Sequence, residues 1–201
     1  MKVILISKNL PDIDINSHEL EKHITFTFLV DGISRACSHQ LVRHRLASYS
    51  QQSQRYVSMK NFPYVTPPSI ENKNVTFTVK GEKISLTYDE FMKLIGEAYE
   101  SLIEQNTPKE DARFILPNSC TTRIVFTMNG KELIHFLKLR TCNRAQWEIR
   151  EMALKILKIV RTTLPEIFNN VGPGCFTTGI CPEGEKSCGK KEEVIKFFKS
   201  L

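Results

Sequence analysis

The sequence predicts an α+β fold in which a mixed sheet packs against helices. Strand patterns and helix patterns both occur along the chain, but they do not alternate steadily, as they would in a doubly wound sheet. The 201 residues, 41% of them hydrophobic, are enough for a sizeable core, and no apolar run approaches the ~20 residues of a membrane span. We therefore expect a single domain over residues 1–201 that does not enter a membrane.

Strand patterns, which are short runs rich in β-branched and aromatic residues, occur at Met1–Ser7, Ile24–Val30, 75–87 and Thr121–Met128. The first run is short, largely apolar and rich in β-branched residues, which predicts a buried strand. The second alternates, so that its apolar residues share one face. Asp31 and Gly32 are expected to end this second strand. Gly81 lies near the middle of the third run, which predicts a hairpin.

Helices are predicted at 33–45, 87–105, 108–117, 131–140, 145–164 and 191–201. Thr87 and Glu90 have the spacing of a capping box, which satisfies backbone N–H groups at the start of a helix. Thr107 and Glu110 have the same spacing, with Pro108 expected at the first helical position. Two of these helices therefore have a predicted start.

The chain carries a formal net charge of +6 and has a pI of about 9.0. An excess of cations favours anionic partners such as nucleotides, phosphorylated cofactors or nucleic acid, although it also serves solubility. The first ten residues have too short an apolar part for a signal peptide and lack a small-residue cleavage site. The expected location is therefore cytoplasmic.

The segment 43–55 is the most strongly cationic and polar part of the chain. It contains three arginines, one histidine and the consecutive hydrogen-bonding run Ser50–Gln54. Such a segment gains little from burial, whereas arginine side chains match phosphate oxygens in pairs. A solvated basic loop is the simplest alternative, but solvation does not require Ser and Gln between the arginines. We expect residues 48–56 to be an extended loop and the whole segment to bind an anion.

Two further groups of arginines lie in a predicted strand and a predicted helix. Arg123 follows the start of the last strand, where a solvent-facing arginine on an edge strand is an equally simple interpretation. Arg140, Arg144 and Arg150 fall within the segment 139–150. A surface ion pair between Arg144 and Glu148 would explain part of this second group.

Motifs spread over nearly the whole chain resemble those of the flavin-dependent thymidylate synthases. The first is Arg43-His44-Arg45 followed by Ser48, Ser53 and Arg55, and it continues the segment 32–42. The others are His23 with Phe26-Thr27-Phe28, Asp111-Ala112-Arg113 with Leu116-Pro117-Asn118, Thr122-Arg123, and 139–150. Matching spacing in several separate segments is far more specific than one short pattern. The resemblance also implies the fold of that family.

The resemblance implies an enzyme that methylates dUMP to dTMP. The carbon donor would be 5,10-methylenetetrahydrofolate, and the hydride source would be FAD reduced by NADPH. The family assembles as a homotetramer with sites shared between subunits, which would let a small chain enclose all of these molecules. Nucleic acid and membranes would not be partners.

The resemblance also implies the site residues. The dUMP site would be formed by polar and cationic residues, namely Gln40, Arg43, Gln51, Gln52, Ser53, Gln54, Arg55, Arg123 and Arg150. The FAD site would be formed by Arg43, His44, Arg45, Gln51, Leu139, Arg140, Thr141 and Arg144. Arg150 is the catalytic candidate, because a fixed positive charge beside the uracil would stabilise the anion of the ring.

Two absences agree with this interpretation. The sequence has no Gly-x-Gly-x-x-Gly pattern, so FAD would bind without a dinucleotide fold. No cysteine has an obvious nucleophile setting such as Pro-Cys-His, which agrees with a flavin mechanism that needs no covalent enzyme nucleophile.

The predicted loop 170–190 carries Cys175, Cys181 and Cys188. Zinc sites usually have four ligands with close cysteine pairs, whereas the gaps here are long and a fourth ligand is not obvious. We therefore expect unreactive thiols and no metal, with zinc as the alternative. Disulfides are not expected in the cytoplasm.

Two other functions fit parts of the sequence. A non-catalytic RNA- or nucleotide-binding module would explain the arginines and the pI, although the chain lacks a recognisable RNA motif and an array of stacking aromatics. A relative of the resembling family that acts on another pyrimidine would share the same motifs. Flavin colour and an assay of dUMP against dCMP and UMP would separate these possibilities.

Overall fold

The structure is a computed structural model that describes residues 1–12, 16–55, 59 and 61–201. The chain divides into two compact units. Unit 1 comprises Met1–Val30, His39–Ser50 and Ile124–Leu201, and unit 2 comprises Asp31–Ser38 and Gln51–Arg123. Helices and sheets occur without a steady alternation, which confirms the predicted α+β class.

A four-stranded sheet has the strand order β1-β2-β6-β3. Its strands are β1 (Lys2–Asn9), β2 (Thr25–Ser34), β6 (Thr121–Asn129) and β3 (Ala47–Gln51). The prediction of a loop from residue 48 is wrong for the first part of that segment, which forms β3. The prediction that Asp31 and Gly32 end the second strand is also wrong, because Gly32 adopts φ +76° and the strand continues.

Strand β1 is at the edge of this sheet, and its side chains alternate between exposed and half-buried. The prediction of a buried strand is therefore wrong. Ile4 and Ile6 are 36% and 53% exposed, although both are apolar. An edge strand has a neighbour on one side only, which an apolar run cannot reveal.

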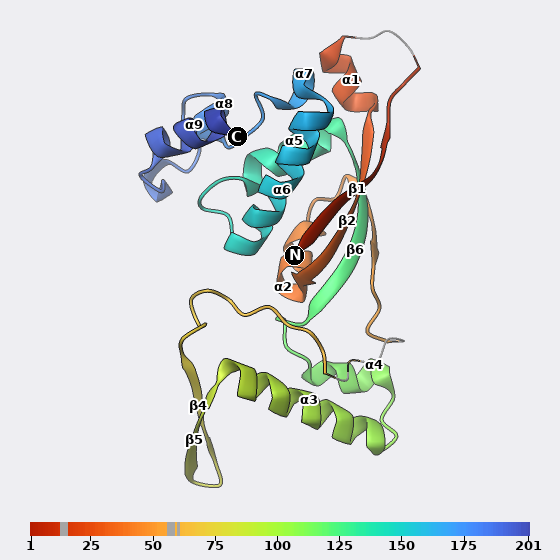
Figure 1. Ribbon diagram of the computed structural model, residues 1–201, viewed down its shortest axis with the longest axis vertical. Coiled ribbons are helices and arrows are strands. Elements are labelled where there is room, and N and C mark those ends of the chain that lie inside the picture. The colour runs from red at the N-terminus through yellow and green to blue at the C-terminus, as the bar shows by residue number, and fades with distance from the viewer. Residues whose placement is uncertain (13–15, 56–58, 60) are drawn as a thin grey trace. The chain divides into compact units, whose positions relative to one another are not determined.

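The helices of unit 1 are α1 (Ser17–His23), α5 (Gly130–Arg140), α6 (Trp147–Thr163), α7 (Pro165–Phe168), α8 (Gly174–Thr177) and α9 (Lys191–Ser200), with a 3-10 turn at Gly184–Lys186. Figure 1 shows α5 and α6 side by side, and α6 also packs against β1. The predicted loop 170–190 therefore contains two short helical turns. The helix predicted at 33–45 is much shorter, because α2 spans only Arg35–Leu41.

The core of unit 1 lies on the face of β2 that the alternating pattern predicts. Phe26, Phe28 and Val30 are completely buried. Phe28 contacts Phe126 of the neighbouring β6, with 5.5 Å between ring centroids. On the opposite face, Thr27 and Thr127 form a hydrogen bond of 2.9 Å. The period-2 pattern thus places one face of the sheet against the helices.

Helix α5 begins at a tight contact with α1. The Asn129 side chain caps it by accepting a hydrogen bond from the N–H of Glu132 at 2.8 Å. A Cβ atom on Gly130 would lie 2.7 Å from the Glu21 carbonyl oxygen and 2.7 Å from Ile24. The chain can therefore turn from β6 into α5 here only with a glycine.

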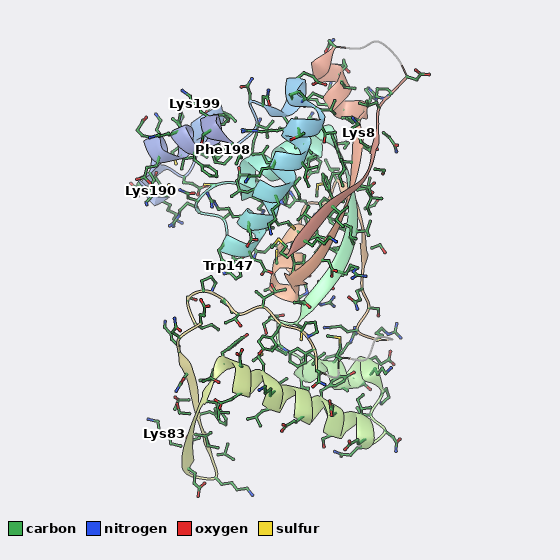
Figure 2. The ribbon with its side chains drawn as sticks, viewed as in Figure 1. Lys8, Lys83, Trp147, Lys190, Phe198 and Lys199 are labelled. Carbon is green, nitrogen blue, oxygen red and sulfur yellow. The ribbon has the colours of Figure 1, made fainter. Side chains whose placement is uncertain are left out.

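Arg161 ties the end of the chain to α6. Its guanidinium donates to three carbonyl oxygens, those of Phe168, Val171 and Phe198, at 3.3, 3.0 and 2.9 Å. Phe198, which Figure 2 labels on α9, is 1% exposed. Burial of its ring and these bonds together hold the terminal helix, which the sequence predicted, on unit 1.

Unit 2 contains a hairpin and a long helix. Strands β4 (Asn74–Val79) and β5 (Glu82–Thr87) are antiparallel and pair Val79 with Glu82. The two residues between them, Lys80 and Gly81, both have positive φ, as a type I′ turn requires. The predicted hairpin is therefore confirmed.

Helix α3 (Tyr88–Glu104) begins with the predicted capping box, in which Thr87 and Glu90 bond each other's backbone N–H. The second predicted capping box does not form. Pro108 itself is the N-cap of α4 (Lys109–Ala112), and no side chain caps that helix. Thr107 lies one residue too early, and a 3-10 turn at Arg113–Ile115 continues the segment.

The core of unit 2 is a cluster of buried residues comprising Met59, Phe62, Met92, Tyr99, Ala112 and Cys120. Partly buried hydrophobic residues pack against it, including Tyr64 and Tyr88. Within the described ranges of the chain, no helix is long and apolar enough to cross a membrane.

Candidate functional site

The motif Arg43-His44-Arg45 lies on the turn between α2 and β3 in unit 1. Arg43 and Arg45 are exposed, whereas His44 is only 5% exposed. The short α2 explains this arrangement, because the chain leaves the helix before the motif and each residue can then point in its own direction. The motif therefore presents two cations to solvent on either side of a buried imidazole.

His44 connects two residues of α5. Its Nδ1 lies 3.1 Å from Oε1 of Glu132, and its Nε2 accepts a hydrogen bond of 3.1 Å from Nε of Arg140. Burial lowers the pKa of His44 below its ordinary value of 6.5; Arg140 and His135 act in the same direction, and Glu132 opposes them. Glu132 was not among the predicted site residues, because it contacts the motif only through His44, 88 positions away in the sequence.

Tyr49 of β3 holds the motif from the other side. Its hydroxyl group lies 2.9 Å from the carbonyl oxygen of Leu41 and 2.7 Å from that of His44. Burial raises the pKa of Tyr49 well above its ordinary value of 10.0, with a smaller contribution from Glu132. The hydroxyl therefore remains a donor and fixes the backbone of the turn.

The remaining predicted FAD residues of unit 1 lie at the end of α5 and in the loop after it. Leu139 is 49% exposed and offers an apolar surface, and Arg144 is exposed. Thr141 is completely buried, and its hydroxyl donates to the Leu137 carbonyl at 2.6 Å. Any ligand contact of Thr141 would therefore come from its backbone.

In unit 2, the predicted residues 51–55 lie beside the start of β6. The Gln51 amide nitrogen donates to the hydroxyls of Ser38 and Thr122 at 2.9 and 3.2 Å. The Gln52 N–H donates to the carbonyl oxygen of Arg123 at 2.9 Å. Two of the separate sequence motifs, 51–55 and 122–123, are thus neighbours in the fold.

Both arginines of the predicted dUMP site that lie in unit 2 hold a carboxylate. Arg123 donates to Asp31 at 2.7 Å, and this bond raises the pKa of Arg123. Arg55 donates to Glu110 through Nε and Nη2 at 2.8 and 2.6 Å. All four side chains are between 40% and 59% exposed, so each pair is open to an incoming anion.

Two other polar groups stand near Arg55. The Ser53 hydroxyl accepts a hydrogen bond from the Arg55 N–H at 3.1 Å. Gln54 is half-buried beside them. Arg35, which the sequence did not single out, lies 3.5 Å from the Gln52 carbonyl oxygen and adds a cation to the same segment.

Arg150 belongs to the first turns of α6 in unit 1, and Gln40 belongs to α2. Both are half-buried. The Nε atom of Arg150 is buried, and none of the described residues supplies it with a hydrogen-bond partner. Glu148 is 2% exposed, so the alternative of a surface pair between Glu148 and Arg144 is wrong. A buried donor without a partner is uncommon in native proteins, so the Nε of Arg150 is a polar group that the described part of the fold leaves unused.

The structure thus brings together some of the predicted residues within each unit. His44 meets Arg140 in unit 1, and the segment 51–52 meets Arg123 in unit 2. The convergence of Arg55, Arg123 and Arg150 on one nucleotide stays a prediction.

All six cysteines are free thiols. Burial raises the pKa of Cys175, and the neighbouring Cys142, Cys181 and Cys188 raise it further. Cys142 thus lies near Cys175, which belongs to the segment 170–190. The sequence did not indicate this proximity. Among the residues that the structure describes, no group of three His, Cys, Asp or Glu side chains is placed to hold a metal ion.

The comparisons with known proteins agree with the motifs. The family model described as thymidylate synthase complementing protein matches residues 14–166. A flavin-dependent thymidylate synthase of Geobacter sulfurreducens is 50% identical over 182 residues, which cover 90% of this chain and 75% of that protein. Proteins of the same name from Clostridium tetani and Pyrococcus furiosus are 44% and 43% identical. These matches cover 88% and 97% of this chain, and 74% and 83% of the two relatives.

Matches of this extent include the basic motif, the strand with Arg123 and the helix with Arg150, in one order along one chain. The chain belongs to the flavin-dependent thymidylate synthase family.

Proposed function

We propose that this protein is an FAD-dependent thymidylate synthase that methylates dUMP to dTMP. The carbon comes from 5,10-methylenetetrahydrofolate, and NADPH reduces the FAD. The observation that carries this proposal is the set of exposed arginines, placed at the motifs that the chain shares with its family. The FAD, when bound, supplies the redox chemistry, while the protein binds, orients and polarises the substrates.

The dUMP phosphate binds to unit 2. Arg55 and Arg123 each hold a carboxylate oxygen there, which supports them as partners of an anionic oxygen of the phosphate. Gln52, Ser53 and Gln54 supply hydrogen bonds to the same phosphate. A phosphate dianion carries more charge than the carboxylates of Asp31 and Glu110 and replaces them as the partner of the two arginines.

The uracil is held by Gln51, Gln40, Arg43 and Arg150. Arg150 is the catalytic residue, because its fixed charge beside N3 and the carbonyl edge stabilises negative charge in the ring. That charge makes C5 a better nucleophile toward the methylene carbon. The unpartnered Nε of Arg150 is a donor that the chain itself does not use.

The residues of unit 1 fit FAD. Arg43, Arg45 and Arg144 are exposed cations that can bind its diphosphate, and Leu139 offers an apolar contact to the flavin ring. Arg140 and the backbone of Thr141 complete this part of the site, and His44 and Gln51 are further residues of the proposed FAD site. The protein acts in the cytoplasm as a homotetramer whose subunits share sites.

An anaerobic turnover assay tests the function directly. The purified protein, which should be yellow, is incubated with FAD, NADPH, methylenetetrahydrofolate and dUMP, and dTMP is the readout. UMP and dCMP replace dUMP in parallel reactions, and each component is omitted once. Formation of dTMP only in the complete mixture supports the proposal. Tight dUMP and FAD binding without any dTMP would refute it.

A further inference from the structure

We propose that Glu132 and His44 are positioning residues that hold the Arg140 guanidinium toward the flavin. Neither acts on the reacting atoms, and Glu132 belongs to none of the motifs that the sequence indicated. This inference rests on the proposed function, since it concerns how the FAD site is kept in shape.

The geometry is a chain of three side chains in unit 1. Glu132 lies in the first turn of α5 and Arg140 is the last residue of that helix. Eight residues of α-helix span about 12 Å along the axis, too far for the two side chains to meet comfortably. The His44 ring, which comes from the turn between α2 and β3, bonds to both at 3.1 Å. It therefore couples the two ends of α5.

The bonds determine the state of the imidazole. An arginine side chain only donates hydrogen bonds, so His44 Nε2 must carry its lone pair toward Arg140. The single proton of the neutral ring is then on Nδ1 and is donated to the Glu132 carboxylate. Glu132 thus selects the tautomer of His44 whose Nε2 can accept a hydrogen bond from Arg140. Carboxylates that bond the other ring nitrogen commonly fix the tautomer of functional histidines in this way.

The surroundings of His44 favour this neutral form. Phe136 packs against the ring edge-on at 5.0 Å, and the side chains of His44 and Glu132 are 4% and 8% exposed. The titratable and charged groups that face His44 are Glu132, His135 and Arg140 from α5 and Tyr49 from β3. Of these, only Glu132 attracts a protonated imidazole.

Acid should therefore break the hydrogen bond between His44 and Arg140. When His44 takes up a second proton, Nε2–H points at a donor and a cation, and Arg140 loses its acceptor. Because the pKa of His44 lies below 6.5, the bonds remain complete at neutral pH and are lost as the pH falls further. FAD binding should weaken over the same range, by about tenfold for one charge-assisted contact.

The experiment measures the FAD dissociation constant from pH 5 to pH 8 by quenching of flavin fluorescence. Wild-type protein should bind about tenfold more weakly at the acid end. His44→Gln keeps one acceptor and one donor but cannot titrate, so its binding should be independent of pH. Glu132→Gln removes the anion that supports the protonated ring, and its acid loss should move to lower pH. His135→Gln removes a neighbour that lowers the pKa of His44, so it should keep the acid loss and move it slightly to higher pH.

Several outcomes would overturn the proposal. A flat wild-type profile, or an acid loss that persists in His44→Gln, would show that His44 does not control the site. If His44→Gln fails to fold, a wild-type profile in Glu132→Gln would have the same meaning. A purely structural pair would lower the unfolding temperature of both variants and leave the pH profile of FAD binding unchanged. Absence of FAD binding at every pH would refute the proposed function together with this inference, whereas pH-independent binding would refute the inference alone.

Discussion

Replacing Arg150 with methionine should make the protein more stable and abolish dTMP formation. The buried Nε of Arg150 has no hydrogen-bond partner in the described part of the chain. A buried polar atom in this state costs about 1–3 kcal/mol, and methionine has an unbranched side chain without it. For a chain of this length, 1 kcal/mol corresponds to about 2–4 °C, so Tm should rise by at least about 2 °C.

Arg161 is the matched control, since it is an arginine on the same helix with a full set of partners. Its guanidinium donates to three carbonyl oxygens and lies 5.8 Å from the centre of the Phe176 ring. Arg161→Met leaves those buried acceptors unpaired and should lower the free energy of unfolding by at least about 2 kcal/mol. Replacement of arginine by methionine at positions 150 and 161 of the same helix should thus have opposite effects on the free energy of unfolding.

Urea unfolding of both variants and of wild type measures these differences. The measurements are made without ligands and at one protein concentration, because the proposed assembly would make stability depend on concentration. The anaerobic assay then measures turnover. If the free energy of unfolding of Arg150→Met is lower than that of wild type by more than about 1 kcal/mol, Arg150 supports the fold instead. Wild-type production of dTMP by this variant, or by Arg150→Ala, would refute its catalytic role.

Three further predictions concern unit 2 and the thiols. Arg55→Ala should weaken dUMP binding about tenfold or more in calorimetry, and Glu110→Gln, which frees Arg55 from a half-exposed pair, should strengthen it by up to about fivefold. Gly81→Ala should destabilise the protein by about 1 kcal/mol because φ is +88° there, whereas Gly96→Ala in α3, with only an ordinary contact at 3.9 Å, should stabilise it by about 0.5–1 kcal/mol. Burial raises the pKa of Cys120 to about 12, so alkylation at pH 8 followed by mass spectrometry should label it after the half-buried thiols Cys142, Cys181 and Cys188.

Each of these has a clear contrary result. An unchanged dUMP dissociation constant in Arg55→Ala would rule out its role at the phosphate. Equal effects of alanine at the two glycines would mean that the turn geometry does not limit stability. Early alkylation of Cys120 would show that the core of unit 2 opens readily.

Local features of the fold were predictable from sequence. The alternation in β2, the hairpin with Gly81 near its turn and the capping box at Thr87 each depend on a few adjacent residues. The exposure of β1 was not predictable, because it depends on the strand's place at the edge of the sheet. The failed cap at Thr107 depended on a shift of one residue, which is finer than a spacing rule resolves.

The partners of the candidate site residues were harder to predict. Asp31 is 92 positions from Arg123, and Glu110 is 55 positions from Arg55. Glu132, His44 and Arg140 meet only because a turn and both ends of a helix come together. The motifs indicated which side chains carry the chemistry, but the residues that orient those side chains are determined by the tertiary fold.

The two arginine–carboxylate ion pairs of unit 2 have a consequence for ligand discrimination. Arg123 and Arg55 are already occupied by Asp31 and Glu110, so an incoming anion exchanges one negative partner for another. A nucleoside that lacks a phosphate brings no charge to this exchange and leaves the carboxylates in place. In the proposed dUMP site, the acidic side chains would therefore act as competitors that a doubly charged group displaces and an uncharged sugar does not.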